Sequence, residues 1–292
     1  MNSLTVITTT YNRAYCLEQL YQSLISQHNK DFIWLVVDDG STDNTKELIE
    51  KWQHEGLVDI EYYYKKNGGM HSARNLAYEK VHTELNTIID SDDWMAPDAV
   101  DNIITFWTKN KDEKHAGMIT LNRNPNGEII GTDMPENVNS CSYRDFWKKY
   151  NMKGDKKLVY RSELTKLYPY PEYENEKFFP ASLKFYLIDK DYDIFLCDFT
   201  TCIVDYNDDS MTRDKYAQYK SCPLGFMYYR REMLKFNTGL KTKVKNMLHY
   251  IMEKKIANTK ADKEILMNPL YYLCYIPGAI FYFYIMKTSR KY

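Results

Sequence analysis

Short apolar runs alternate with segments of three-to-four-residue apolar spacing through the first hundred residues of the chain. The runs have the length and β-branched content of strands, and they cover residues 4–9, 32–37, 60–64 and 86–90. The segments between them have the spacing of amphipathic helices, as in Leu17, Leu20, Tyr21, Leu24 and Ile25. This alternation of strand and helix predicts a parallel sheet with helices on both faces.

The remainder of the chain is less regular and gives a coarser prediction. Strands are expected near residues 117–121, 157–160, 193–196 and 201–206, and helices near residues 142–150 and 180–189. Beyond Asp214 the pattern is mainly helical. We therefore expect an α/β domain over residues 1–212, with halves at 1–110 and 111–212, and a helical region over residues 213–292.

Composition narrows the class of protein. The net charge of −1 over 292 residues offers no basic field, so we expect no nucleic-acid partner. The six cysteines show no C-x-x-C pairing, which is typical of free thiols in a reducing cytoplasm. The first predicted strand follows without the charged region of a secretory signal, so we expect a cytoplasmic protein.

Four polar segments follow predicted strands, at residues 9–13, 38–41, 67–75 and 90–93. Ligands of parallel α/β sheets bind at the carboxyl ends of the strands, and these ends meet along one rim of the sheet. The sequence therefore predicts one ligand site assembled from all four segments.

Three carboxylates, those of Asp90, Asp92 and Asp93, lie within four residues after a predicted strand. Their repulsion is relieved if a cation sits among them, and Mg²⁺ or Mn²⁺ takes carboxylate oxygens together with substrate phosphates. Such an ion clamps a diphosphate and neutralises charge on a departing nucleoside diphosphate. The alternative is a solvated acidic turn that caps the helix beginning near Pro97.

Two other polar segments are candidates for nucleotide contacts. Asp39 can accept hydrogen bonds from a base or a ribose, although Asp-Gly is also a turn signal and Asp43 a helix cap. Gly68 and Gly69 precede a predicted helix and allow close backbone approach to a ligand. Arg74 can face a phosphate or brace the acidic residues, and the alternative is a plain loop with a salt-bridged arginine.

In this order and strand context, these motifs resemble those of family 2 glycosyltransferases with the GT-A fold. That fold is a Rossmann-like α/β domain with a mixed, mainly parallel central sheet, here followed by a helical C-terminal extension. The resemblance covers roughly residues 1–110. It rests on Thr8-Thr9-Thr10-Tyr11-Asn12-Arg13, Val37-Asp38-Asp39-Gly40-Ser41-Thr42-Asp43, Asn67-Gly68-Gly69 through Ala73-Arg74-Asn75, and Asp90-Ser91-Asp92-Asp93.

The resemblance implies a nucleotide-sugar site and a metal site. The nucleotide-sugar site would be formed by Thr9, Tyr11, Arg13, Asp39, Asn67, Gly69, Arg74, Asp90 and Ser91. Asp92 would be the main ligand of Mn²⁺ or Mg²⁺, with Asp90 beside it and Asp93 as a helper. The donor would be a nucleotide-diphosphate sugar, with UDP favoured, and the hexose or N-acetylhexosamine would go to a glycan or lipid-linked acceptor in bacterial surface polysaccharide synthesis.

The middle segment resembles a bacterial branch of this family that reads E-K-F-x-P-E and later Y-x-x-D-G-[LM]-T. Here the first motif lies in Glu176-Lys177-Phe178-Phe179-Pro180-Ala181, so alanine replaces its final acidic residue. The second motif lies in Tyr206-Asn207-Asp208-Asp209-Ser210-Met211-Thr212, with Ser210 in place of glycine.

Because Ala181 stands where the motif has its acidic residue, another residue must be the catalytic base. The family inverts the anomeric centre in one displacement, which requires a carboxylate that takes the proton from the acceptor hydroxyl. Ala181 cannot serve, so the candidates are Glu176 first, then Glu174, with Asp209 from the later motif. The alternative for Glu176 is a surface charge paired with Lys177.

The C-terminal segment has a basic, apolar, basic pattern. Residues 235–263 contain eight lysines against Glu253 and Asp262, residues 265–286 carry no charge, and three basic residues follow. Pro269 and Pro277-Gly278 are expected to interrupt the apolar stretch, and several tyrosines suit an interface. We expect a helix pair on or in the cytoplasmic leaflet of the membrane, with peripheral contact through residues 235–292. The alternative is a helical unit that packs on the catalytic domain or dimerises.

Two other functions fit parts of the pattern. A sugar-phosphate nucleotidyltransferase also pairs carboxylates with Mg²⁺, but its phosphate loop is usually rich in glycine, and residues 9–13 contain none. A non-catalytic nucleotide-sugar binding protein is favoured by Ala181 alone, whereas Asp90 and Asp92 argue against it.

Overall fold

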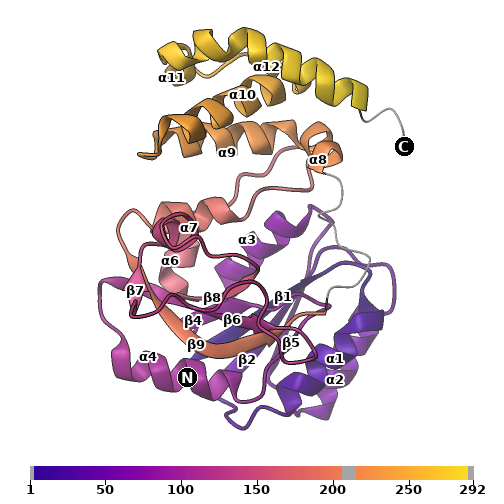
Figure 1. Cartoon of the computed structure of the whole chain (residues 1–292). Helices are drawn as coiled ribbons and strands as arrows, with labels where there is room; N and C mark the ends of the chain where they lie inside the picture. The colour runs from indigo at the N-terminus through magenta and orange to yellow at the C-terminus, as the bar shows by residue number, and fades with distance from the viewer. Residues whose placement is uncertain (1–2, 206–214, 289–292) are drawn as a thin grey trace. The chain divides into compact units, whose positions relative to one another are not determined.

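The computed structural model describes residues 3–205 and 215–288, which form two compact units (Figure 1). Among these residues, the first unit comprises 3–169 and 184–205, and the second comprises 170–183 and 215–288. The boundary expected at residue 212 lies outside the described residues. Residues 170–183, expected in the α/β domain, group instead with the C-terminal helices, and the side chain of Glu176 bonds to one of these helices.

The first unit is built on a mixed sheet, as the fold class predicted. Its strand order is β3-β2-β1-β4-β8-β6-β9-β5, with β7 paired to β9. The strands are β1 (Leu4–Thr10), β2 (Phe32–Asp38), β3 (Ile60–Tyr64), β4 (Leu85–Ile88), β5 (Trp94–Met95), β6 (His115–Arg123), β7 (Ser140–Cys141), β8 (Lys156–Arg161) and β9 (Asp193–Ile203). The half from β3 to β4 is entirely parallel, and β8 enters antiparallel between β4 and β6.

Helices cover both faces of this sheet (Figure 1). They are α1 (Ala14–Ile25), α2 (Thr45–Glu55), α3 (Met70–Lys80), α4 (Ala99–Asn110), α5 (Tyr143–Lys148), α6 (Ser162–Leu167) and α7 (Ser182–Ile188). The apolar faces of α1, α2 and α4 join one core cluster, and those of α5 and α6 join a second. The parallel half was predicted from the alternation of strands and helices, and its strands β1 and β2 are buried almost throughout, as strands covered by helices on both faces are.

Buried aromatic rings pack the first two helices against the sheet. Tyr21 of α1 stacks on Trp52 of α2 with ring centroids 4.2 Å apart, and Trp34 of β2 packs beside both. The indole nitrogen of Trp34 donates to Thr8 Oγ1 at 3.0 Å, so its one polar atom is satisfied. Strands β1 and β2, which carry two of the candidate loops, are thereby held in fixed register.

One prediction for this unit was wrong in detail. Residues 193–196 and 201–206 were expected to be two strands, whereas β9 is continuous from Asp193 to Ile203. Its pairing with β6 contains register shifts, so its side chains do not keep one regular alternation of buried and exposed positions. The apolar pattern in the sequence is therefore interrupted inside a strand that is itself continuous.

The second unit is helical, as expected. It contains α8 (Lys215–Ser221), α9 (Pro223–Lys235), α10 (Leu240–Ile256), α11 (Lys263–Leu266) and α12 (Pro269–Thr288). Helix α10 lies between α9 and α12 (Figure 1). The expected break at Pro277 is wrong, because α12 continues through it. A Cβ at Gly278 would lie 2.8 Å from Ile251 of α10, so the two helices meet there in close contact, and tertiary packing of this kind can hold a helix across a proline.

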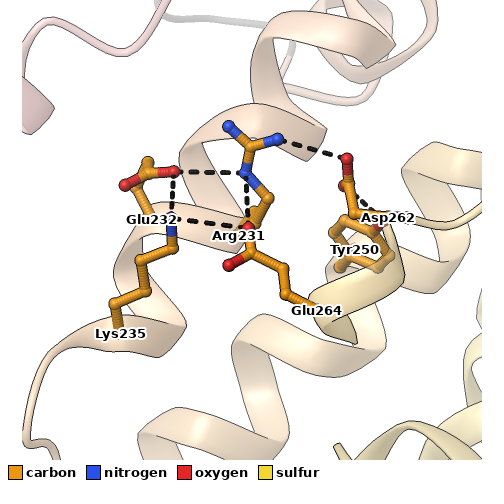
Figure 2. A network of polar contacts seen from close by, with 6 residues as sticks. All are labelled: Arg231, Glu232, Lys235, Tyr250, Asp262 and Glu264. Carbon is orange, nitrogen blue, oxygen red and sulfur yellow. Dashed lines mark hydrogen bonds and ion pairs between the residues drawn. The ribbon is translucent and has the colours of Figure 1, made fainter. Parts of the chain in front are cut away.

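A polar network joins the ends of α9, α10 and α11 (Figure 2). Arg231 pairs with Glu232, Asp262 and Glu264, and Lys235 pairs with Glu232 and Glu264. The hydroxyl of Tyr250 donates to Asp262 Oδ2 at 2.7 Å and accepts from the Asp262 backbone N–H. Lys235, the first of the C-terminal lysines, is therefore engaged within the unit.

Candidate active site

The loops after β1 and β2 are joined by hydrogen bonds at the carboxyl edge of the sheet. Asn12 adopts a left-handed backbone with φ of 52°, which places its amide side chain toward the second loop. Its Oδ1 accepts from the Thr42 N–H at 2.7 Å, and its own N–H donates to Ser41 Oγ at 2.8 Å. Asp43 accepts from the Ala14 N–H and from Thr45, so it caps both following helices. The two loops therefore form one rigid edge beside Tyr11 and Arg13.

The carboxylate of Asp39 is buried and anchors the glycine loop. Its Oδ1 accepts from Lys65 Nζ and the Gly68 N–H, both at 2.9 Å. Its Oδ2 accepts from the Gly69 N–H at 2.7 Å and from Asn67 Nδ2 at 3.2 Å. Every bond described for this carboxylate is made to the loop, so its immediate effect is to shape the backbone there. The nucleotide contact predicted for Asp39 stays a prediction.

The glycine loop turns directly into α3. Gly69 has φ of 91°, a conformation that L side chains rarely adopt, and its carbonyl accepts the first backbone bonds of the helix. A Cβ at Gly40 would come within 2.7 Å of the Asn67 nitrogen, so the approach of the two loops needs a glycine there. Asn67 Oδ1 is buried and has no hydrogen-bond partner among the described residues, which leaves an acceptor for a ligand.

The three carboxylates of the acidic loop each face a cation from a different segment. Arg13 Nη1 lies 2.7 Å from Asp92 Oδ2, and Arg74 Nη2 lies 3.1 Å from Asp90 Oδ1. Lys157 Nζ of β8 lies 3.7 Å from Asp93 Oδ2. Asp90 and Asp92 keep about two fifths of their side chains exposed, whereas Asp93 is buried. The buried hydroxyl of Ser91 accepts from Arg13 Nη1 at 3.4 Å.

Burial and these ion pairs shift the pKa values of Asp93 and Asp90 in opposite directions. Burial, with the charges of Asp90 and Asp92, raises the pKa of Asp93 to about 7 against the opposite effect of Lys157. Burial alone would also raise the pKa of Asp90, but Arg74, Lys157 and Arg13 together hold it below its usual value. Asp90 is therefore an ionised carboxylate at neutral pH.

The residues at this edge fit a divalent cation that is shared with a substrate. The described residues contain no group of three His, Cys, Asp or Glu side chains arranged to hold a metal by themselves. Asp92 and Asp90 offer hard carboxylate oxygens on their exposed sides, and Mg²⁺ or Mn²⁺ completes such a set with phosphate oxygens and water. The donor set therefore suits an ion bound together with a diphosphate.

Glu176, the first candidate for the base, caps helix α9. Its Oε1 accepts from the Leu224 N–H and its Oε2 from the Gly225 N–H, both at 2.7 Å. Gly225 permits this approach, since a Cβ there would lie 3.2 Å from Oε2. Glu176 is not the surface charge of the alternative reading either, because it is buried. Glu174 is exposed, and Asp209 lies outside the described residues.

The sequence model of Glycosyl transferase family 2 matches residues 5–166, more than half of the chain. The chain belongs to glycosyl transferase family 2. Its matched span contains the rim loops, the acidic loop and β8.

Relatives agree with this family. TarS of Staphylococcus aureus, a poly(ribitol-phosphate) beta-N-acetylglucosaminyltransferase, is 27% identical over 188 residues, which cover 63% of this chain and 30% of TarS. An uncharacterised glycosyltransferase of Mycoplasma pneumoniae is 34% identical over 110 residues, 36% of this chain and 37% of that protein. The chain thus spans well under half the length of these curated relatives.

Solved structures of other glycosyltransferases share the fold. Residues 1–349 of S. aureus TarS in complex with UDP-GlcNAc superpose with a TM-score of 0.60 at 20% identity, covering 94% of this chain and 79% of that one. A mannosyltransferase of Pyrobaculum calidifontis in complex with GDP-Man and Mn²⁺ gives a TM-score of 0.56 at 15% identity, covering 96% and 86%. The GT-A fold expected from the motifs is confirmed.

Two basic residues of this family 2 site were missed from the sequence. Lys65 bonds Asp39 from the segment before the glycines, and Lys157 reaches Asp93 from β8. A signal for Lys157 was present, because this lysine opens the strand predicted near residues 157–160 and precedes the apolar run Leu158-Val159-Tyr160. A lysine in an apolar strand needs a polar partner, and the acidic loop offered three carboxylates.

Proposed function

We propose that this chain is an inverting glycosyltransferase that moves a sugar from a nucleotide-diphosphate donor, UDP-linked in the first instance, to a hydroxyl of a glycan or lipid-linked acceptor. The observation that carries the proposal is the convergence of Arg13, Arg74, Asp90 and Asp92 at one edge of the sheet. Two arginines beside two part-exposed carboxylates match a diphosphate together with a divalent cation.

The chain's own residues would bind and orient the donor. Tyr11, about half exposed, and Thr9 at the end of β1 would line the nucleotide pocket. Asn67 and Gly69 would border the nucleotide, with Asp39 fixing the shape of their loop. Arg13 and Arg74, now paired with carboxylates, would donate to phosphate oxygens.

Mn²⁺ or Mg²⁺, held by Asp92 and Asp90, would supply neutralisation of the charge that develops on the leaving diphosphate. Ser91, buried between these two residues, would keep the loop in shape through its bond with Arg13. The donor of the mannosyltransferase with the same fold is bound with Mn²⁺, which supports the assignment.

The base that takes the proton from the acceptor hydroxyl would be Glu174 or Asp209. Glu176 is disfavoured, because both of its oxygens accept backbone hydrogen bonds from α9. A carboxylate in that role must have a free oxygen within hydrogen-bond reach of the acceptor. The exposed side chain of Glu174 meets the first of these requirements.

Relatives indicate the kind of acceptor. TarS is named for a poly(ribitol-phosphate) acceptor and an N-acetylglucosaminyl donor, and a chondroitin synthase of Pasteurella multocida is 33% identical over 137 residues. We propose a role in bacterial surface polysaccharide synthesis on the cytoplasmic side of the membrane. Contact with that membrane would be peripheral and made through the C-terminal unit, whose helix α12 is long and apolar enough to be a candidate span.

Turnover of the purified chain tests the proposal. With UDP-GlcNAc and Mn²⁺ we expect release of UDP, abolished by EDTA. Asp92→Asn should lower kcat by at least a hundredfold, because it weakens the cation site and leaves Arg13 without its carboxylate, while folding is retained. Asp98→Asn is the matched control, since that exposed carboxylate pairs with His28, away from the acidic loop.

The outcomes separate the alternatives. An Asp92→Asn enzyme with full metal-dependent turnover would contradict the metal assignment. Donor binding without UDP release in the presence of glycan and lipid-linked acceptors would instead favour the non-catalytic binding protein.

A further inference from the structure

Lys157 occupies an unusual position beneath the acidic loop. It lies on β8, in the middle of the sheet, and its register with β4 pairs Thr87 with Val159 two residues away. Lys157 itself pairs with Thr120 of β6, the neighbouring strand on the other side. Its side chain is about nine-tenths buried, so its charge cannot be solvated by water.

Lys157 lies on a sheet face that carries both apolar and polar residues, including its buried cross-strand partner Thr120. Val159 and Met118, on neighbouring positions of the same sheet face, belong to the main hydrophobic core. Its polar neighbours include Asp93 Oδ2, 3.7 Å from the ammonium, and Cys202, whose thiol also contacts Asp93 Oδ2 at 3.7 Å. A buried ammonium needs polar partners, and the ion-pair partner of Lys157 is the carboxylate of Asp93.

The charge balance of the acidic loop indicates what the Lys157–Asp93 pair does. Three carboxylates face three cations, but the pairs differ in burial. Arg13 and Arg74 pair with the part-exposed carboxylates of Asp92 and Asp90, which they can exchange for phosphate oxygens. Lys157 has no such alternative, so it stays with Asp93 and leaves two negative charges, those of Asp90 and Asp92, on the open side.

We propose that Lys157 is the permanent counter-charge of the acidic loop. It is a positioning residue that keeps Asp93 out of the cation site, so that the two remaining carboxylates of the loop match the charge of one divalent ion. The inference rests on the proposed cation site and adds to it a residue from a distant strand. Without Lys157, Asp93 would lose its buried partner while Asp90 and Asp92 keep their arginines, and the loop, with one positive charge fewer beside it, would attract divalent cations more strongly.

Binding of Mn²⁺ alone, followed by the EPR signal of the free ion at pH 8, tests this without any need for turnover. Lys157→Met should bind Mn²⁺ roughly tenfold more tightly than the wild type, because a positive charge near the ion has been removed. Its thermal stability in EDTA should fall, and Mn²⁺ should restore part of it. An Mn²⁺ affinity equal to that of the wild type would overturn the inference.

Lys156→Met is the matched control. Lys156 is as buried as its neighbour, but it donates to the carbonyls of Ile130 and Lys153 at 2.7 and 3.2 Å on the other face of the strand. This variant should lose stability with no change in Mn²⁺ affinity. A tighter Mn²⁺ site in Lys156→Met would show that general loosening, and not charge, causes the effect.

A second pair of variants covers the case in which Lys157→Met does not fold. Asp93→Asn should weaken Mn²⁺ binding, and Asp93→Asn with Lys157→Met should return it to the wild-type value, since both members of the buried pair are then neutral. A double variant as weak as Asp93→Asn would make Asp93 a direct ligand and overturn the proposal.

The result also separates this inference from the proposed function. If the wild type binds no Mn²⁺, either alone or with UDP present, the proposed cation site fails, and the role of Lys157 fails with it. If the wild type binds Mn²⁺ and the lysine variant binds it equally well, only the role of Lys157 is lost.

Discussion

Four carboxylates of this chain fall into two kinds according to the groups that their oxygens contact. Glu176 and Asp39 have both oxygens bonded to backbone N–H groups, and both are buried. Asp92 and Asp90 contact guanidinium groups and keep part of their surface exposed. The first kind organises a loop or a helix end, and the second kind is available to a ligand, so the contacts of a carboxylate decide its role more sharply than its position in a motif.

This division predicts opposite effects for Glu176→Gln and Glu174→Gln. Glutamine at 176 must turn an NH₂ group toward one of the two N–H donors of α9, so we expect a loss of about 1–2 kcal/mol in the free energy of unfolding, with kcat of the folded protein retained. Glutamine at 174 should leave stability unchanged, because the side chain is exposed. If Glu174 is the base, kcat should fall at least a hundredfold.

Thermal unfolding and kcat, measured on both variants, check the pair. A stable Glu176→Gln protein without turnover would return the base to Glu176. If neither variant loses turnover, Asp209 is the remaining candidate.

At the scale of elements, α12 has two different faces. Tyr271, Cys274, Gly278 and Ile285 are buried, and Gly278 packs against Ile251 of α10. On the outer face, Leu273, Ile276, Ile280 and Phe283 are 63 to 76% exposed. Lys255 of α10 lies over the rings of Tyr275 and Tyr282, which places a positive charge beside this apolar face. Such a face suits the surface of an anionic bilayer, with the helix lying in its plane.

Vesicle flotation tests this reading of α12. Replacing Ile276 and Ile280 together by serine should sharply reduce co-flotation with phosphatidylglycerol vesicles, because their apolar area no longer enters the lipid. Leu57→Ser is the control, since Leu57 is an exposed apolar residue of the first unit. Undiminished flotation of the double variant would contradict membrane contact through this face, and a variant that instead changes from dimer to monomer would assign the face to a second copy.

The elements also show where sequence reasoning succeeds. Strand β3 was predicted at its observed bounds and β1 and β2 within one residue, because runs rich in β-branched and aromatic residues between clear loop signals leave little choice. The helix break predicted at Pro277 was wrong. A proline weakens a helix locally, but contacts with a neighbouring helix decide whether the helix ends there. Residues 170–183 were misplaced because the bond from Glu176 to α9 spans 48 positions and has no local pattern.

At the scale of the whole molecule, the candidate site is an assembly of segments far apart in the sequence. The rim rule of parallel sheets was enough to bring together the loops near Tyr11, Asp39, Asn67 and Asp90, since all follow neighbouring parallel strands. It could not include Lys157, because β8 enters antiparallel and its place in the sheet depends on tertiary pairing. The clustered carboxylates after the fourth strand had indicated a divalent cation, whereas the nucleotide-sugar donor came from the family resemblance, because no spacing rule could have named it.

The central claim is that the rim binds a nucleoside diphosphate together with a divalent cation shared by Asp92 and Asp90. Isothermal titration of UDP into the purified chain, with Mn²⁺ and again with EDTA, measures this directly. We predict binding with one-to-one stoichiometry in Mn²⁺, at least tenfold weaker in EDTA, and loss of that difference in Asp92→Asn. Binding of UDP that is equally tight with Mn²⁺, with EDTA and in Asp92→Asn would contradict the account.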